Sequence, residues 1–128
     1  MKGNKKLVEE WFIKGDRDIE TAQFLFEHRR PTDIIAVFIQ QSIEKYLKGY
    51  LIYHGWGLKK IHDLQELLNE AIKIDKTFEK FLVNCIRISK YYLDTRYPGT
   101  PTDYSEEEIK KSIDVANEII DKIKQDLK

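Results

Sequence analysis

The segment from Ile34 to His54 is the longest apolar-rich stretch of the chain, and it also carries a polar side. Five apolar residues recur along it at spacings of three and four: Ala36, Ile39, Ile43, Leu47 and Leu51. This period predicts a helix whose apolar stripe faces a core. A polar set lies beside and opposite the stripe: Gln40, Gln41, Glu44, Lys45 and Lys48. We therefore expect a central helix whose polar side is either a hydrated surface or the wall of a site.

Helical periodicity continues on both sides of this segment, and no stretch alternates as a strand would. Further helices are predicted over about 4–28, 62–73, 76–93 and 105–127. Pro31 separates the first helix from the central one, because proline disfavours the helical conformation in the residue before it. The pattern predicts an all-α fold, an antiparallel up-and-down four-helix bundle with an additional short helix. At this length we expect a single domain over residues 1–128.

The last two predicted helices each carry an informative apolar pattern. The inner side of the first of them is expected to contain Phe78, Phe81, Leu82, Cys85, Ser89 and Tyr92. In this pattern Cys85 is a buried packing residue rather than a reactive thiol. Ser105 and Glu108 form a Ser-x-x-Glu capping box that opens the last helix. A narrow apolar seam follows, formed by Ile109, Ile113, Ala116, Ile120, Ile123 and Leu127. It can pack on the bundle or on another copy of the chain.

Charge, hydropathy and cysteine content exclude several classes of protein. The 22 basic and 22 acidic residues cancel, so the overall basic footprint of a duplex DNA-binding protein is missing. No stretch approaches about 20 uncharged apolar residues, and no secretory signal is recognised, so we expect a cytoplasmic protein without a membrane span. Cys85 is the single cysteine and the three histidines have no ligand spacing, so no metal site is expected.

An acidic residue interrupts the apolar stripe of the first predicted helix. The residues that share this face are Leu7, Trp11, Gly15, Asp18, Ala22 and Leu25. A carboxylate in such a position is costly unless it is paired or hydrogen-bonded. Asp18 is therefore either a structural acid that holds a neighbouring basic side chain or a functional carboxylate.

Polar residues of the central helix and of the segment after it each have two interpretations. Glu44 precedes Lys48 by four residues, which is the spacing of a surface ion pair of little energetic value. In that interpretation Lys45 and Lys48 belong to a hydrated face, and in the other they form an anion site. His62, next to Asp63 at a helix start, is a general acid or base, a ligand, or part of the helix cap.

The loop sequence Arg96-Tyr97-Pro98 precedes a capped helix start. Backbone donors and an arginine can meet a phosphate at such a position. In the other interpretation Arg96 pairs with Asp18 and fixes the loop, while Tyr97 packs beneath it. The two interpretations are compatible with each other.

Four motifs occur in a recognisable order along the chain. They are Trp11 with Asp18 and Ala22, the run Gln40-Gln41-x-x-Glu44-Lys45-x-x-Lys48, then His62-Asp63-Leu64, and Arg96-Tyr97-Pro98. This combination resembles the HEPN domain, a nucleotide-binding domain of higher eukaryotes and prokaryotes, over about residues 6–124. The resemblance implies a five-helix bundle, commonly a homodimer, often encoded in prokaryotes beside a small nucleotidyltransferase. Carried over residue by residue, the implied ligand-binding positions are Asp18, Gln41, Glu44, Lys45, Lys48, His62, Arg96 and Tyr97.

Many HEPN proteins are ribonucleases that carry the motif Arg-x(4–6)-His, and this chain departs from that pattern. At those offsets after Arg87 stand Tyr92, Leu93 and Asp94, and no other arginine is followed there by a histidine. Tyr92, at the histidine position, is a phenol, and a phenol does not shuttle protons well near pH 7. We therefore assign no catalytic residue from the sequence.

The leading hypothesis is a non-catalytic module that binds a nucleotide, such as ATP or GTP, or another phosphate-bearing ligand, and requires no cofactor. In this hypothesis Lys45, Lys48 and Arg96 supply positive charge, Gln41 and Tyr97 supply hydrogen bonds, and Asp18 orients Arg96. The expected partner is a small nucleotidyltransferase, in a two-component or toxin–antitoxin-like system. Two alternatives stay open: a ribonuclease with an atypical site that uses His62 and Arg96, and a purely structural module that contacts another protein.

Overall fold

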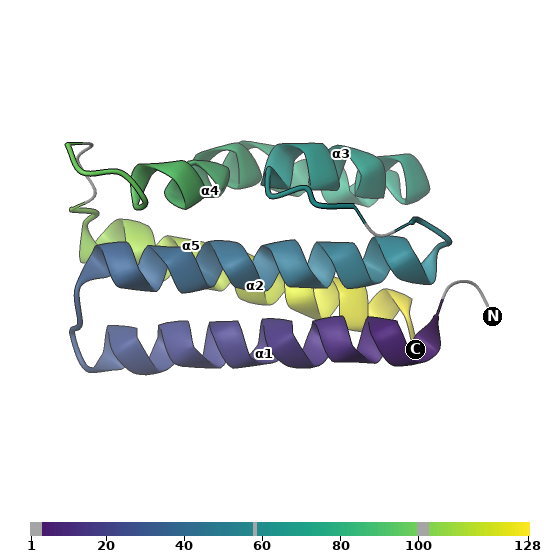
Figure 1. Ribbon diagram of the computed structural model, residues 1–128, viewed down its shortest axis with the longest axis horizontal. Coiled ribbons are helices and arrows are strands. Elements are labelled where there is room, and N and C mark those ends of the chain that lie inside the picture. The colour runs from purple at the N-terminus through teal and green to yellow at the C-terminus, as the bar shows by residue number, and fades with distance from the viewer. Residues whose placement is uncertain (1–3, 58, 100–102) are drawn as a thin grey trace.

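The computed structural model describes residues 4–57, 59–99 and 103–128 (Figure 1). Its elements are α1 (Lys5–Glu27), α2 (Thr32–Tyr53), α3 (Leu64–Ile74), the 3₁₀ helix η1 (Lys76–Phe81), α4 (Leu82–Asp94) and α5 (Glu106–Asp126). No strand occurs within the described ranges. The predicted all-α fold is confirmed, and the predicted helices differ from the observed ones mainly at their ends.

The helices are arranged as an up-and-down bundle. α2 and α5 lie in the middle, between α1 on one side and α3 with α4 on the other (Figure 1). Along the chain α1, α2, α4 and α5 alternate in direction, and the short α3 is the additional helix (Figure 1). In the described part of the chain, no helix combines the length and the apolar character that crossing a membrane requires.

The helix α2 is the centre of the core because it packs against α1, α3, α4 and α5. Its predicted stripe from Ala36 to Leu51 is buried. Burial extends to the polar side as well, where Gln40, Glu44 and Lys48 are only 0%, 3% and 4% exposed. The hydrated-surface interpretation is therefore wrong for these three residues, since neighbouring segments cover α2 on this side too.

The predicted helix over 76–93 is divided into η1 and α4. The Asp75 carboxylate accepts hydrogen bonds from the Thr77 backbone at 3.0 Å and from the Thr77 hydroxyl at 2.7 Å, and η1 starts there. A 3₁₀ turn holds fewer residues than an α-turn, so η1 shifts the phase of the following helix. Ile88 and Tyr91 are consequently buried, whereas Ser89 and Tyr92, which were predicted to face inward, are only half-buried.

The apolar seam of α5 packs inside the chain's own bundle. Ile109, Ile113, Ala116, Ile120 and Ile123 are buried, and Val115 and Ile119 widen the seam. The seam therefore packs on the chain's own bundle rather than on another copy of the chain. It offers no free surface to another protein. The Ser105 half of the predicted capping box is confirmed, because the Ser105 hydroxyl accepts a hydrogen bond from the Glu108 backbone at 3.0 Å, while the Glu108 carboxylate accepts from the Tyr91 hydroxyl at 2.6 Å. Cys85 is buried as predicted, and burial raises its pKa to about 12.

The helices α1 and α2 approach each other closely at Gly15. An added Cβ at Gly15 would lie 2.6 Å from a ring carbon of Tyr46 and 3.3 Å from the backbone oxygen of Ser42. The Tyr46 ring is held in place, because it stacks on Phe12 with centroids 4.7 Å apart and its hydroxyl donates to Asp16 at 2.5 Å. Burial and this hydrogen bond also raise the pKa of Tyr46. Glycine at position 15 is therefore a packing requirement.

We predict that Gly15→Ala lowers the free energy of unfolding by about 1–3 kcal/mol, because overpacking at a fixed ring outweighs the gain in helix propensity. Urea unfolding followed by circular dichroism measures the change. Gly57→Ala is the control, since an added Cβ there meets nothing within 4 Å. Equal stability of both variants and the parent would contradict this account of the α1–α2 contact.

Candidate functional site

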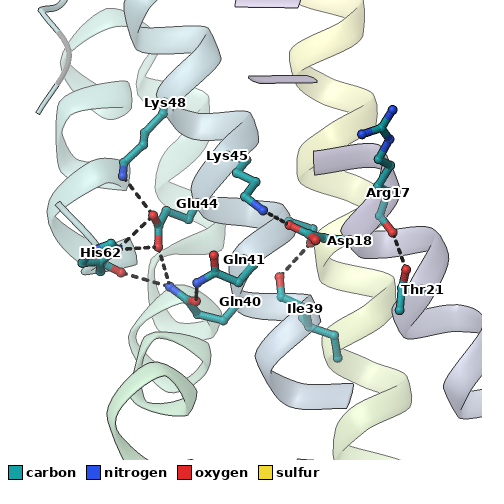
Figure 2. A network of polar contacts seen from close by, with 11 residues as sticks. Arg17, Asp18, Thr21, Ile39, Gln40, Gln41, Glu44, Lys45, Lys48 and His62 are labelled. Atoms are coloured by element: carbon teal, nitrogen blue, oxygen red, sulfur yellow. Dashed lines mark hydrogen bonds and ion pairs between the residues drawn. The ribbon is translucent and has the colours of Figure 1, made fainter. Parts of the chain in front are cut away.

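A buried carboxylate on α2, that of Glu44, is the hub of a polar cluster (Figure 2). Glu44 accepts from Lys48 Nζ at 2.9 Å and from Gln40 Nε2 at 3.1 Å. Nδ1 of His62 lies 3.0 and 3.2 Å from its two carboxylate oxygens. The side chains of Glu44 and Lys48 are 4% and 5% exposed. The predicted surface ion pair is thus a buried one. Its desolvation free energy is offset only by the ion pairing and the hydrogen bonds.

Two glutamines extend this cluster to the backbone before α3. Gln40 Nε2 also donates to the backbone oxygen of His62 at 3.0 Å, and Gln41 Nε2 donates to Gln40 Oε1 at 2.7 Å. These bonds fix the segment that carries His62 against α2. We call Gln40, Gln41, Glu44, Lys48 and His62 the Glu44 cluster.

The acid in the stripe of α1 is a structural partner of α2. The Asp18 carboxylate accepts from Lys45 Nζ at 2.5 Å, with the two side chains 13% and 21% exposed (Figure 2). A basic partner for Asp18 was predicted, but the expected partner Arg96 is wrong. Lys45 and Lys48 are each paired with a carboxylate inside the chain, so neither has an unpaired charge to offer a ligand.

His62 and Arg96 both lie on the ring of Tyr92. The imidazole stacks on this ring with centroids 4.6 Å apart and an interplanar angle of 12°. The guanidinium carbon of Arg96 lies 4.1 Å from the centroid of the same ring. Tyr97, by contrast, is 62% exposed, so the prediction that it packs beneath Arg96 is wrong. Tyr92 takes that place because it lies four residues before Arg96, one helical turn away.

A groove opens beside this stack, between the start of α3 and the outer side of α4. Its volume is about 360 Å³, and it is lined by His62, Asp63, Gln65, Ile86, Ser89, Lys90, Tyr92 and Leu93. A volume of this size falls within the range of small-molecule sites. The Ser89 hydroxyl accepts from the Leu64 backbone at 2.9 Å and donates to Asp63 at 3.1 Å, which fixes the two walls to each other. Asp63 also caps α3 by accepting from the Gln65 backbone at 2.9 Å. His62 lies before the cap, so it has no capping role.

One cation lines the groove, and a second lies over the ring of one of its lining residues. Lys90 lines it, and Arg96 lies over Tyr92, which lines it too. Neither side chain forms an ion pair with a described residue. Asp63 is the one carboxylate among the lining residues, and its oxygen is engaged by Ser89 and the α3 backbone. An anionic group is therefore best accommodated near Lys90 and Arg96, away from Asp63.

Arg87 and Tyr92, which stand at the spacing of the ribonuclease motif, serve different parts of the structure. Arg87 donates to the Ser112 hydroxyl at 2.6 Å and to the Tyr91 hydroxyl at 3.0 Å. Tyr91 in turn donates to Glu108 at 2.6 Å, and burial raises its pKa. Arg87 is thus tied to α5, and it is not among the residues that line the groove.

The predicted site residues separate into three groups. Gln41, Glu44, Lys48 and His62 meet in the Glu44 cluster, and Arg96 joins them through Tyr92. Asp18 and Lys45 form a pair of their own, and Tyr97 stands apart. Sequence reasoning missed Lys90, Ser89 and Gln65, which line the groove. No signal in the sequence marks Lys90, because it is one of many exposed lysines on a helix and the groove beside it appears only in the fold. Within the described ranges, no group of His, Cys, Asp and Glu side chains is arranged to hold a metal ion.

Comparisons with known proteins identify one family. The model of the HEPN domain family matches residues 8–126, which is nearly the whole chain. Neither the search of curated proteins nor that of solved structures produced a match.

We predict that Glu44→Ala lowers the free energy of unfolding by about 3–5 kcal/mol, because it leaves the Lys48 ammonium buried without a counter-charge. Replacing both residues of the pair with methionine is expected to cost much less, since no buried charge remains. Urea unfolding measures both variants. Glu70→Ala, which removes an exposed ion pair with Lys73, should leave the unfolding midpoint almost unchanged. A Glu44→Ala variant as stable as Glu70→Ala would contradict the role given to the Glu44 cluster.

Proposed function

This chain belongs to the HEPN domain family, and from that premise we propose that it binds a nucleotide or another phosphate-bearing ligand without catalysing a reaction. The observation that supports this most is the groove beside His62 and Tyr92, with Lys90 in its lining and Arg96 over the Tyr92 ring. Phosphate oxygens favour arginine and lysine donors, and an arginine held on an aromatic ring loses little freedom when it binds.

The proposal assigns different roles to the two polar groups of residues. Lys90 and Arg96 attract the phosphate, and the edges of His62 and Tyr92, with Gln65, contact the rest of the ligand. The Glu44 cluster positions His62 from behind, through the contact of Nδ1 with the carboxylate. Lys45 and Lys48 stay with their carboxylate partners, because removing either from its partner would leave a charge poorly compensated.

We propose further that the module acts with a small nucleotidyltransferase, whose nucleotide, ATP or GTP, is the ligand. Membership of the family supports this partner. Because the net charge of the chain is +0, it is not repelled overall by an acidic or a basic protein. Co-expression with a small nucleotidyltransferase, followed by affinity capture through a tag on either protein, tests the partnership. If neither tagged protein captures the other, or if capture is the same without the tagged protein, the partnership is refuted.

The same geometry supports a second candidate function, cleavage of RNA. If Nδ1 of His62 carries the proton toward Glu44, Nε2 is the basic nitrogen and can accept a proton from a hydroxyl group. Arg96 shares the Tyr92 ring with His62 and can stabilise negative charge on a phosphate in the transition state. Incubation with total RNA distinguishes the two functions. Cleavage that both His62→Ala and Arg96→Ala abolish would replace the binding proposal with this one.

For the binding function we predict that AMP, ATP or GTP at millimolar concentration raises the melting temperature of the chain. A ligand at about 1,000 times its dissociation constant adds about 4 kcal/mol to stability by linkage. Lys90→Ala and Arg96→Ala should each weaken binding about tenfold, and added salt should weaken the binding of the parent chain.

Lys111→Ala is the matched control, because Lys111 is also an exposed lysine, lies on α5 and is not among the residues that line the groove. It should leave the ligand-induced shift unchanged. The absence of any shift with all three nucleotides, or equal losses in Lys111→Ala and Lys90→Ala, would refute the assignment of the groove.

A further inference from the structure

The two carboxylate oxygens of Asp63, the one acidic residue that lines the groove, are used differently. Oδ1 accepts a hydrogen bond from the Gln65 backbone at 2.9 Å and another from the Ser89 hydroxyl at 3.1 Å. Oδ2 has no hydrogen bond or ion pair with a residue in the described ranges. Because each carboxylate oxygen has two lone pairs, Oδ1 is saturated, whereas Oδ2 can still accept two hydrogen bonds.

The same two hydrogen bonds hold the free oxygen in a fixed place. Ser89 belongs to α4 and the Gln65 backbone belongs to the first turn of α3, so both walls of the groove hold the carboxylate. A polar group that is held in one position discriminates between ligands by where their donors and acceptors lie. Oδ2 of Asp63 is therefore suited to recognise a particular arrangement of donors in a ligand.

The neighbouring side chains in the groove suit a flat heterocycle. Ile86 and Leu93 are 36% and 58% exposed, and they offer an apolar surface to the face of a ring. The side-chain amide of Gln65 forms no hydrogen bond within the described part of the chain, so its donors and its acceptor are available. The groove thus combines an apolar surface, a fixed acceptor and a free amide.

Among the nucleobases, guanine matches a fixed acceptor that has two free lone pairs. Its N1–H and N2–H₂ groups are adjacent donors on the Watson–Crick edge, and O6 beside them is an acceptor. Adenine presents the lone pair of N1 at that place and cytosine presents that of N3, while uracil has a single donor between two acceptors. A lone pair that faces Oδ2 is repelled and leaves the oxygen without a hydrogen bond.

We propose that the ligand of the groove is a guanine nucleotide and that Asp63 is the residue that selects the base. This inference rests on the proposed binding function and makes it specific. Oδ2 of Asp63 accepts from N1–H and N2–H₂ of guanine, and the amide of Gln65 donates to O6. The phosphate then lies near Lys90 and Arg96, away from the carboxylate, as the charges require.

Isothermal titration calorimetry of the full chain with GMP, AMP and inosine monophosphate tests this selection. GMP should bind about tenfold more tightly than AMP, because only guanine satisfies the carboxylate. Inosine monophosphate keeps N1–H but lacks the N2 amino group, so its affinity should lie between the other two. Equal affinities for GMP and AMP overturn the role of Asp63 and leave the binding function in place. If none of the three nucleotides binds, both proposals are refuted.

Asp63→Asn reverses the hydrogen-bonding character of the free position. Its Oδ1 must stay where the Gln65 and Ser89 donors meet it, so an NH₂ group takes the place of Oδ2. Asparagine caps a helix as well as aspartate does, so the fold should be retained. The NH₂ group opposes N1–H of guanine but donates to N1 of adenine. The ratio of GMP affinity to AMP affinity should therefore fall about tenfold or more, so that the preference for GMP is lost or reversed.

Glu66→Gln is the matched control, because Glu66 is an exposed acid in the first turn of α3 that does not line the groove. It removes the same negative charge one turn or less from Asp63 and should leave the ratio of GMP affinity to AMP affinity unchanged. Circular dichroism checks the folding of both variants, and the parent series decides the selection even if one does not fold. Asp63→Asn with the preference of the parent, or an equal change of the ratio in Glu66→Gln, overturns the proposal.

Discussion

The structure depends on how the negative charge of Glu44 is compensated in the interior of the bundle. A carboxylate that is 4% exposed is costly unless every oxygen has a partner, and here Lys48, Gln40 and His62 supply them. Because His62 belongs to the segment before α3, these bonds decide where that segment crosses α2. The charge of Glu44 on α2 thus fixes the groove wall that His62 forms just before the next helix, α3.

This compensation also decides which cations are available to a ligand. Lys45 and Lys48 look like an anion site along the sequence, yet their charge is matched by Asp18 and Glu44 inside the fold. Two cations without an ion pair to a described residue lie elsewhere, Lys90 on α4 and Arg96 just after its end. In the proposed binding mode the ligand lies on the α4 side of His62 rather than along the polar side of α2, and His62 connects the two regions.

The features that depend on local sequence could be predicted, and those that depend on tertiary partners could not. Helical periodicity and the Ser105 cap are properties of neighbouring residues, so both were predicted correctly. The need of Asp18 for a partner was predicted, but its choice of Lys45 depends on how α1 crosses α2. The 3₁₀ turn of η1 shifted the phase of α4, which moved Tyr92 from the expected core to the groove. Lys90 escaped notice because an exposed lysine on a helix carries no signal without the groove beside it.

The central claim is that a phosphate-bearing ligand binds beside His62 and Tyr92, and backbone amide NMR tests it most directly. In a titration of the isotope-labelled chain with AMP, the account predicts saturable chemical-shift changes concentrated in residues 62–65 and 86–96, while α1 and α5 stay nearly unchanged. Changes concentrated around Lys45 on the α1–α2 side, or a spectrum that millimolar AMP, ATP and GTP all leave unchanged, would contradict the account.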